Sequence, residues 1–153
     1  MKKKLLLTEV LRIKADVEER IERLFYDIVS YNMTDTDIAV YMLQLEKLED
    51  FLIVLKLAIQ EANLSKLDGV MNYFTIFKVS NLKAKLRLYY RIEKALKRAT
   101  LKKSRLAQIT LEEVTSKIAS TTGEIALFEE RLTRFNNKKK LTISIDESLE
   151  YLL

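Results

Sequence analysis

Apolar residues recur every three or four positions through the first thirty residues of the chain. They are spaced 3, 4, 4, 3 and 4 residues apart, at Val10, Ile13, Val17, Ile21, Leu24 and Ile28. Charged side chains fill the opposite face of the pattern. Thr8 is a good N-cap residue, and Glu9 suits the first turn of a helix. The pattern therefore predicts a helix over residues 8–31, with a narrow stripe suited to packing on another long helix.

A second stripe follows residues 33–37, a polar stretch rich in cap-forming residues that predicts a turn. Leucines dominate this stripe, and their spacing of 3 and 4 is typical of a helix-packing seam. The candidate seam residues are Leu45, Leu48, Leu52, Leu55 and Ile59. We therefore expect a second helix over residues 38–62. The short loop makes the two helices antiparallel, and neither can bury its stripe alone.

The helical period breaks in the middle of the chain, where Asp68-Gly69 indicates a turn. Residues 70–79 are rich in aromatic and β-branched side chains. The segment 67–79 therefore fits either a short β-hairpin or an irregular aromatic connection, packed in the core or exposed as an assembly surface. Ser80 is then expected to cap a third helix over residues 81–99. Its inward positions are Leu82, Leu86, Tyr89, Ile92 and Leu96.

Residues 100–109 carry no helical stripe, so an extended connection is expected there. Thr110 and Glu113 then form a Thr-x-x-Glu capping box, which opens a fourth helix over residues 110–136. Gly123 interrupts this helix at a cost of about 1 kcal/mol relative to alanine. A kink or a close helix contact would explain the glycine.

The C-terminal tail, residues 141–153, begins with a segment of different character. Residues 141–145 alternate between apolar and polar side chains, as in a short strand. The residues after it are expected to form a helical turn or a frayed end.

Composition supports this helical interpretation. The 153 residues fit one domain, 1–153. The chain has no proline and only two glycines, so long helices with few sharp turns are expected. We predict an all-α fold in which long antiparallel helical hairpins form a four-helix bundle.

The chain lacks both histidine and cysteine. This excludes Cys/His zinc sites and any Ser-His or Cys-His nucleophile. Adjacent carboxylates such as Glu18 and Glu19 point about 100° apart on a helix, so they do not converge on a metal ion or a substrate. We expect no enzymatic activity, no metal, no cofactor and no small-molecule substrate.

Two further features bear on location. The apolar run after Lys2, Lys3 and Lys4 is only three residues long, too short for an export signal. No stretch approaches the ~20 apolar residues that span a membrane. Together with the absence of cysteine, these features predict a cytoplasmic protein.

Charge is strongly segregated along the chain. From Lys83 to Arg105 there are ten basic residues and one acid, Glu93, so this stretch carries +9 while the whole chain carries +5. Such a stretch faces either an external anion or the acidic remainder of the protein. The candidate contacts to an anion or a nucleic acid are Arg91, Lys94, Lys97, Arg98, Lys102, Lys103 and Arg105.

Three interpretations of the basic stretch remain open. It forms a solvated face neutralised by acids of other helices or subunits, such as Glu18, Glu19, Glu22, Glu46, Glu49 and Asp50. Alternatively, it binds nucleic acid, with Tyr89 and Tyr90 available to stack on unpaired bases. Tyr89 also lies on the apolar stripe, which favours a core position for it. Contact with anionic lipid is the third interpretation.

Residues Leu7 to Asp16 read L-T-E-V-L-R-I-K-A-D. This segment is similar to L-x-E-A-L-x-x-R-A-D, the opening of a septicolysin-like family of small bacterial helical proteins, and the order of elements also resembles that family. Further matches follow in order, at Ile59 with Asn63, Asp68-Gly69, Leu82 to Leu96, and Arg131-Leu132 with Asn136, so the resemblance covers residues 7–141. The segment after Gly69 is aromatic here but acidic and alanine-rich in the family, and Asn137 stands where the family often has tryptophan. The resemblance implies an elongated helical protein capable of self-association, and brings no established activity.

From these observations we expect a non-enzymatic scaffold or interaction module that forms a homo-oligomer. A nucleic-acid-binding protein that uses residues 83–105 is the first alternative. A membrane-active, cytolysin-like protein is the second.

Overall fold

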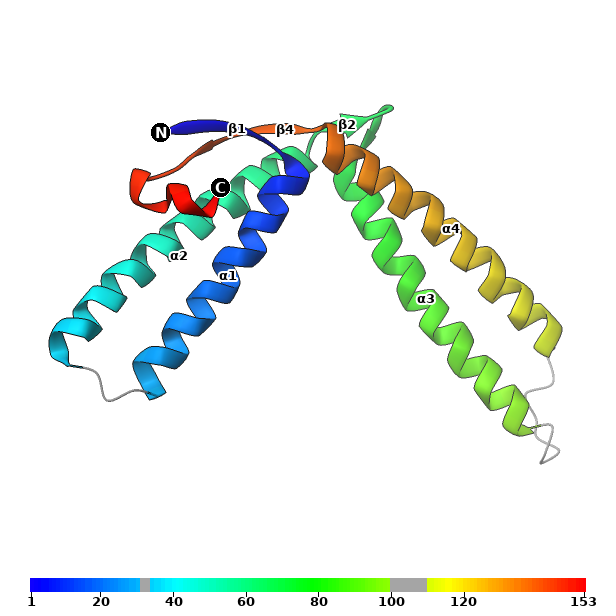
Figure 1. Cartoon of the computed structure of the whole chain (residues 1–153). Coiled ribbons are helices and arrows are strands. Elements are labelled where there is room, and N and C mark those ends of the chain that lie inside the picture. Colours follow the sequence, from blue (N-terminus) through cyan, green and yellow to red (C-terminus); the bar gives the residue numbers. More distant parts are fainter. Residues whose placement is uncertain (31–33, 100–109) are drawn as a thin grey trace. The chain divides into compact units, whose positions relative to one another are not determined.

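The computed structural model describes residues 1–30, 34–99 and 110–153. Residues 100–109, where an extended connection is predicted, therefore lie outside the described residues. In chain order the elements are β1 (Lys2–Leu6), α1 (Leu7–Ser30), α2 (Asp35–Asn63), β2 (Lys66–Leu67), β3 (Val70–Met71), α3 (Asn72–Ala99), α4 (Leu111–Lys138), β4 (Lys140–Ser144) and the 3-10 helix η1 (Glu147–Leu152) (Figure 1).

The predicted all-α fold of antiparallel helical hairpins is confirmed. Helix α1 packs on α2, and α3 packs on α4 (Figure 1). The chain divides into two compact units, each built around one of these pairs. The first unit comprises Met1–Ser65 and Asn136–Leu153, and the second comprises Lys66–Phe135.

The apolar stripe of α1 forms one half of the core of the first unit. Val10, Ile13 and Val17 are almost completely buried, as the spacing predicts. From α2, Leu48 and Leu55 complete the contact, and both are 0% exposed. The predicted helix pairing through a narrow apolar seam is therefore present in this unit.

The seam of α2 differs in detail from the predicted one. Leu45, Leu48 and Leu55 are buried, but Leu52 and Ile59 are only half-buried. Phe51 is buried in the place expected for Leu52. An α-helix turns once per 3.6 residues, so a straight helix drifts from a strict 3.5-residue repeat and brings neighbouring positions into the contact.

Both helices of the first unit begin slightly earlier than predicted. Helix α1 starts at Leu7, so Thr8 is not its N-cap, and the Glu9 carboxylate accepts a hydrogen bond from the Leu6 backbone N–H at 2.6 Å. Helix α2 starts at Asp35, with Thr34 as N-cap. The Thr34 hydroxyl accepts a hydrogen bond from the Asp37 N–H at 3.3 Å.

The two ends of the chain pair as antiparallel strands. Strand β4 confirms the predicted alternation, because Leu141 and Ile143 are buried while Thr142 is exposed. Strand β1 was not predicted, because three successive lysines show no strand pattern. It forms because Lys2 to Leu6 pair in register with Ser144 to Lys140.

The tail after β4 is ordered against the first unit. Asp146 caps η1, and its carboxylate accepts a hydrogen bond from the Ser148 N–H at 2.8 Å. Leu149 and Leu152 are buried. Lys3 of β1 forms an ion pair with Glu150 at 3.1 Å, which ties the tail to the first strand.

The second unit opens with a short β-hairpin, one of the two alternatives predicted for the middle of the chain. Strands β2 and β3 are antiparallel and are joined by Asp68 and Gly69. Both residues have positive φ angles, 52° and 77°, as in a type I′ turn. The Arg131 guanidinium of α4 donates a hydrogen bond to the Leu67 carbonyl, which fixes the hairpin to that helix.

Helix α3 begins at Asn72, so the predicted start at residue 81 is wrong, and Ser80 lies exposed inside the helix. The aromatic and β-branched residues disfavour a helix only weakly. Tertiary packing decides, because Thr75, Val79 and Leu82 share one buried face. The rings of Tyr73 and Phe77, one turn apart, stack with centroids 5.7 Å apart.

The predicted capping box of α4 is confirmed. The Thr110 N–H donates a hydrogen bond to the Glu113 carboxylate at 2.8 Å, and the Glu113 N–H donates to the Thr110 hydroxyl at 3.1 Å. Gly123 lies in the middle of the continuous helix, with nothing within 4 Å of the position that a Cβ would occupy. A close helix contact therefore does not explain this glycine.

Candidate functional site

Four basic residues of α3 form a row along one side of the helix. Arg87, Arg91, Lys94 and Arg98 are spaced 4, 3 and 4 residues apart, which places them on one face. All four side chains are exposed. We call this row the basic stripe.

Two lysines in the first half of α3 form ion pairs with acids of α4. The Lys83 ammonium lies 2.6 Å from the Glu129 carboxylate, and the Lys78 ammonium lies 3.6 Å from Glu124. Both are exposed ion pairs, so each contributes at most about 1 kcal/mol to stability.

The four residues of the basic stripe differ from Lys78 and Lys83 in this respect. Within residues 1–30, 34–99 and 110–153, none of its four side chains forms an ion pair. Lys97, a predicted contact residue, does not belong to the stripe, because its ammonium pairs with the Glu93 carboxylate at 3.0 Å. The stripe is therefore a row of cations without neutralising groups in the described protein.

The remaining predicted contact residues have separate outcomes. Arg91, Lys94 and Arg98 lie in the stripe. Lys102, Lys103 and Arg105 lie outside the described residues. Arg87 was missed among the predicted contacts, although its spacing of four residues from Arg91 was visible in the sequence.

The two adjacent tyrosines of α3 have different environments. Tyr89 is half-buried, and the Lys117 ammonium lies 6.0 Å from the centre of its ring. Tyr90 is 50% exposed and follows Arg87 by three residues and precedes Lys94 by four. Tyr90 is therefore an accessible aromatic ring beside the basic stripe.

The two compact units carry opposite net charge. The first contains 12 basic and 15 acidic residues, a net charge of −3. The second contains 15 basic and 7 acidic residues, a net charge of +8. The second unit therefore has a positive electrostatic potential, which salt screens over about one Debye length, roughly 8 Å at physiological ionic strength.

Two of the acids proposed to neutralise the basic segment have partners within the first unit. The Glu18 carboxylate accepts a hydrogen bond from the Lys14 ammonium at 2.7 Å. It also lies 3.7 Å from the Lys56 ammonium. The hydrogen bond from Lys14 is the main reason that the pKa of Glu18 is lowered. Glu19 forms an ion pair with Arg23.

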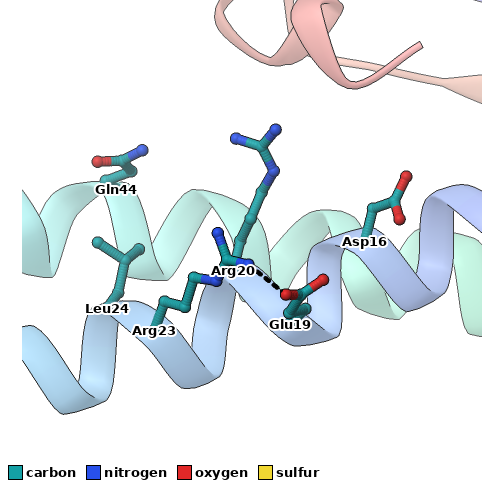
Figure 2. Close-up of a pocket in the computed structure, with 6 residues that line it drawn as sticks. All are labelled: Asp16, Glu19, Arg20, Arg23, Leu24 and Gln44. Atoms are coloured by element: carbon teal, nitrogen blue, oxygen red, sulfur yellow. Dashed lines mark hydrogen bonds and ion pairs between the residues drawn. The ribbon is translucent and has the colours of Figure 1, made fainter.

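A hollow beside these residues lacks the features of a reactive site. Figure 2 shows its six lining residues, which are Asp16, Glu19, Arg20, Arg23, Leu24 and Gln44. The acids and bases balance one another, and Arg20 extends away from α1 instead of converging with Glu19 (Figure 2). The Arg20 guanidinium lies 5.0 Å from the centre of the Tyr151 ring, so this side chain contacts the C-terminal tail.

The described ranges contain no cluster of three or more acidic side chains arranged to hold a metal ion. None of the helices described is long and apolar enough to cross a membrane. Comparison with protein-family models, with curated proteins and with solved structures finds no match to this chain.

Proposed function

We propose that this protein is a non-enzymatic cytoplasmic scaffold that self-associates through the outer face of α2. The observation that carries the proposal is the set of large apolar side chains that α2 leaves exposed. Beyond its buried seam, α2 exposes six large apolar side chains, which are Val40, Met42, Leu43, Ile53, Val54 and Leu57. Exposed apolar patches often mark interaction surfaces, and Ile53 and Leu57 lie one turn apart on the exposed side of α2.

A second copy of the chain is the proposed partner. Helix α3 also exposes the apolar side chains of Phe74, Phe77 and Leu88. The unit that contains α2 is acidic and the unit that contains α3 is basic. Charge complementarity therefore favours contact between α2 of one copy and α3 of another, with apolar side chains at the centre of the interface.

The mass of the protein in solution tests this proposal. We expect light scattering at micromolar concentration to give at least twice the chain mass of 17.9 kDa. Ile53 and Leu57 are 56% and 60% exposed and lie one turn apart, so their replacement by asparagine should leave the hairpin folded. The double variant should be monomeric.

A matched control replaces Val29 and Leu127, two exposed apolar residues outside α2, with asparagine. This control should keep the mass of the unmodified protein. A monomeric unmodified protein, or equal loss of mass in the two double variants, would contradict assembly through α2.

A further inference from the structure

We propose that the basic stripe binds the phosphate backbone of single-stranded nucleic acid. Its four cations are exposed and have no ion-pair partner in the described protein. Binding of a polyanion would release counterions from the phosphates, which is the main source of sequence-independent affinity for nucleic acid. This activity goes beyond the proposed scaffold role.

The spacing of the stripe suits a strand of phosphates. Residues three or four apart on a helix lie roughly 4.5–6 Å apart along its axis. The stripe from Arg87 to Arg98 therefore extends over roughly 16 Å. The spacing between neighbouring cations of the stripe is close to the separation of successive phosphates along an extended nucleic-acid strand. Three of the four residues are arginines, whose planar guanidinium groups donate two parallel hydrogen bonds to a phosphate.

The exposed ring beside the stripe distinguishes single strands from duplexes. Tyr90 lies on the same side of α3 as Arg87 and Lys94, and half of its surface is accessible. Bases of a single strand are free to stack on such a ring, whereas the bases of a duplex are already stacked on one another. Stacking on Tyr90 together with backbone contacts gives binding without sequence preference.

The arrangement favours nucleic acid over a membrane surface. An interfacial helix needs apolar side chains that continue directly from its basic face into the lipid. On α3 the buried face, with Thr75, Val79 and Leu82, belongs to the core of the second unit. Among the exposed apolar residues of α3, Phe74 and Phe77 lie ten or more residues before Arg87, and Leu88, three residues before Arg91, borders the stripe. One leucine does not supply the row of apolar side chains that an interfacial helix inserts into lipid.

Fluorescence anisotropy with a labelled oligothymidylate tests the proposal on the full-length protein. Four phosphate contacts predict a log–log salt slope of about −3, or roughly fifty-fold weaker binding when salt is raised fourfold. Replacing Arg87, Arg91 and Lys94 with glutamine should weaken binding at least tenfold and bring the slope to about −1. Tyr90→Ala should weaken binding roughly tenfold with the slope unchanged.

The matched control replaces Lys66, Lys85 and Arg134 with glutamine. These residues belong to the same unit, are exposed and form no ion pair among the described residues, so the control loses the same three charges away from the stripe. It should bind within about twofold of the unmodified protein. If the triple stripe variant does not fold by circular dichroism, the single variants Arg91→Gln and Lys85→Gln make the same comparison.

Three outcomes would overturn the proposal. The first is absence of oligonucleotide binding at low salt. The second is equal weakening by the stripe and control variants, which would assign binding to diffuse net charge. The third is binding to vesicles of anionic phospholipid without binding to the oligonucleotide, which would assign the stripe to a membrane surface.

Discussion

The core of the first unit is best tested by comparing two leucines of α2 that lie four residues apart. Leu48 is 0% exposed, whereas Leu52 is half-buried. Replacing Leu48 with alanine removes three carbon atoms, which costs about 2.4 kcal/mol at roughly 0.8 kcal/mol per buried methylene. The surrounding residues of α1 cannot fully close the cavity, so the total cost should lie between about 2.5 and 5 kcal/mol.

Leu52→Ala removes the same atoms from a position that water already reaches. The free energy lost by no longer burying these atoms is roughly half that at Leu48, and water fills the space so that no cavity forms. We therefore expect the free energy of unfolding to fall by about 1 kcal/mol. Urea denaturation followed by far-ultraviolet circular dichroism measures both variants. The midpoints should change and the slopes should not, because the surface exposed on unfolding stays nearly constant.

The opposite ranking would refute this account of the seam. If Leu52→Ala costs as much as Leu48→Ala, then Leu52 and not Phe51 occupies the buried position, as the strict heptad pattern predicts. A cost below about 0.5 kcal/mol for Leu48→Ala would show that the α1–α2 contact does not stabilise the unit.

Two further predictions follow from local structure. Gly123→Ala should raise the free energy of unfolding by about 0.5–1 kcal/mol, because the site is helical and open. Gly69→Ala should lower the free energy of unfolding, because the φ angle of +77° at this position is strained for alanine. Thermal or urea denaturation of both variants checks the signs, and destabilisation by Gly123→Ala would contradict the open geometry. The pKa of Glu18 is lowered by its hydrogen bond from Lys14, so Glu18 stabilises the fold above the ordinary value of 4.5, and this contribution is lost as pH falls through the folded-state pKa. When urea denaturation is carried out at neutral pH and again below the folded-state pKa of Glu18, the Glu18→Gln variant should lose less free energy of unfolding than the unmodified protein. Equal losses in the two proteins would argue against the prediction.

Local patterns predicted the helical elements better than the strands. The stripe from Val10 to Ile28 and the capping box at Thr110 each depend on residues within a few positions of one another, so the sequence alone identifies them. Strand β1 depends on hydrogen bonds between Lys2 and Ser144, at opposite ends of the chain. Such pairing has no local pattern, especially in a strand that begins with three lysines.

The start of α3 shows how composition can obscure periodicity. Tyr73, Phe74 and Phe77 are typical of strands, and this composition outweighed the spacing of Thr75, Val79 and Leu82, which fits a helix. In the structure the buried stripe decides, because packing against other residues outweighs propensity differences of less than about 1 kcal/mol per residue. The helical period was therefore the better guide in this segment.

The candidate site shows a different limit of the sequence. The spacing of Arg91, Lys94 and Arg98 places them on one face, and adding Arg87 needs only the same rule. The acids of α4 form ion pairs with Lys78 and Lys83. The position of α4 therefore decides which cations of α3 remain unpaired. Local spacing therefore identifies the row, and tertiary structure identifies its free charge.

Helix α3 separates three kinds of surface around one axis. The face with Thr75, Val79 and Leu82 is buried in the second unit. A second surface, in the C-terminal half of the helix, carries the basic stripe with Tyr90 and Leu88 beside it, and a third, in the N-terminal half, exposes Phe74 and Phe77. Since Phe74 and Phe77 lie ten or more residues before Arg87, a polyanion on the stripe leaves these two side chains accessible to a second copy. The segregated charge of this stretch is therefore compatible with both proposals, and neither requires the other to be correct.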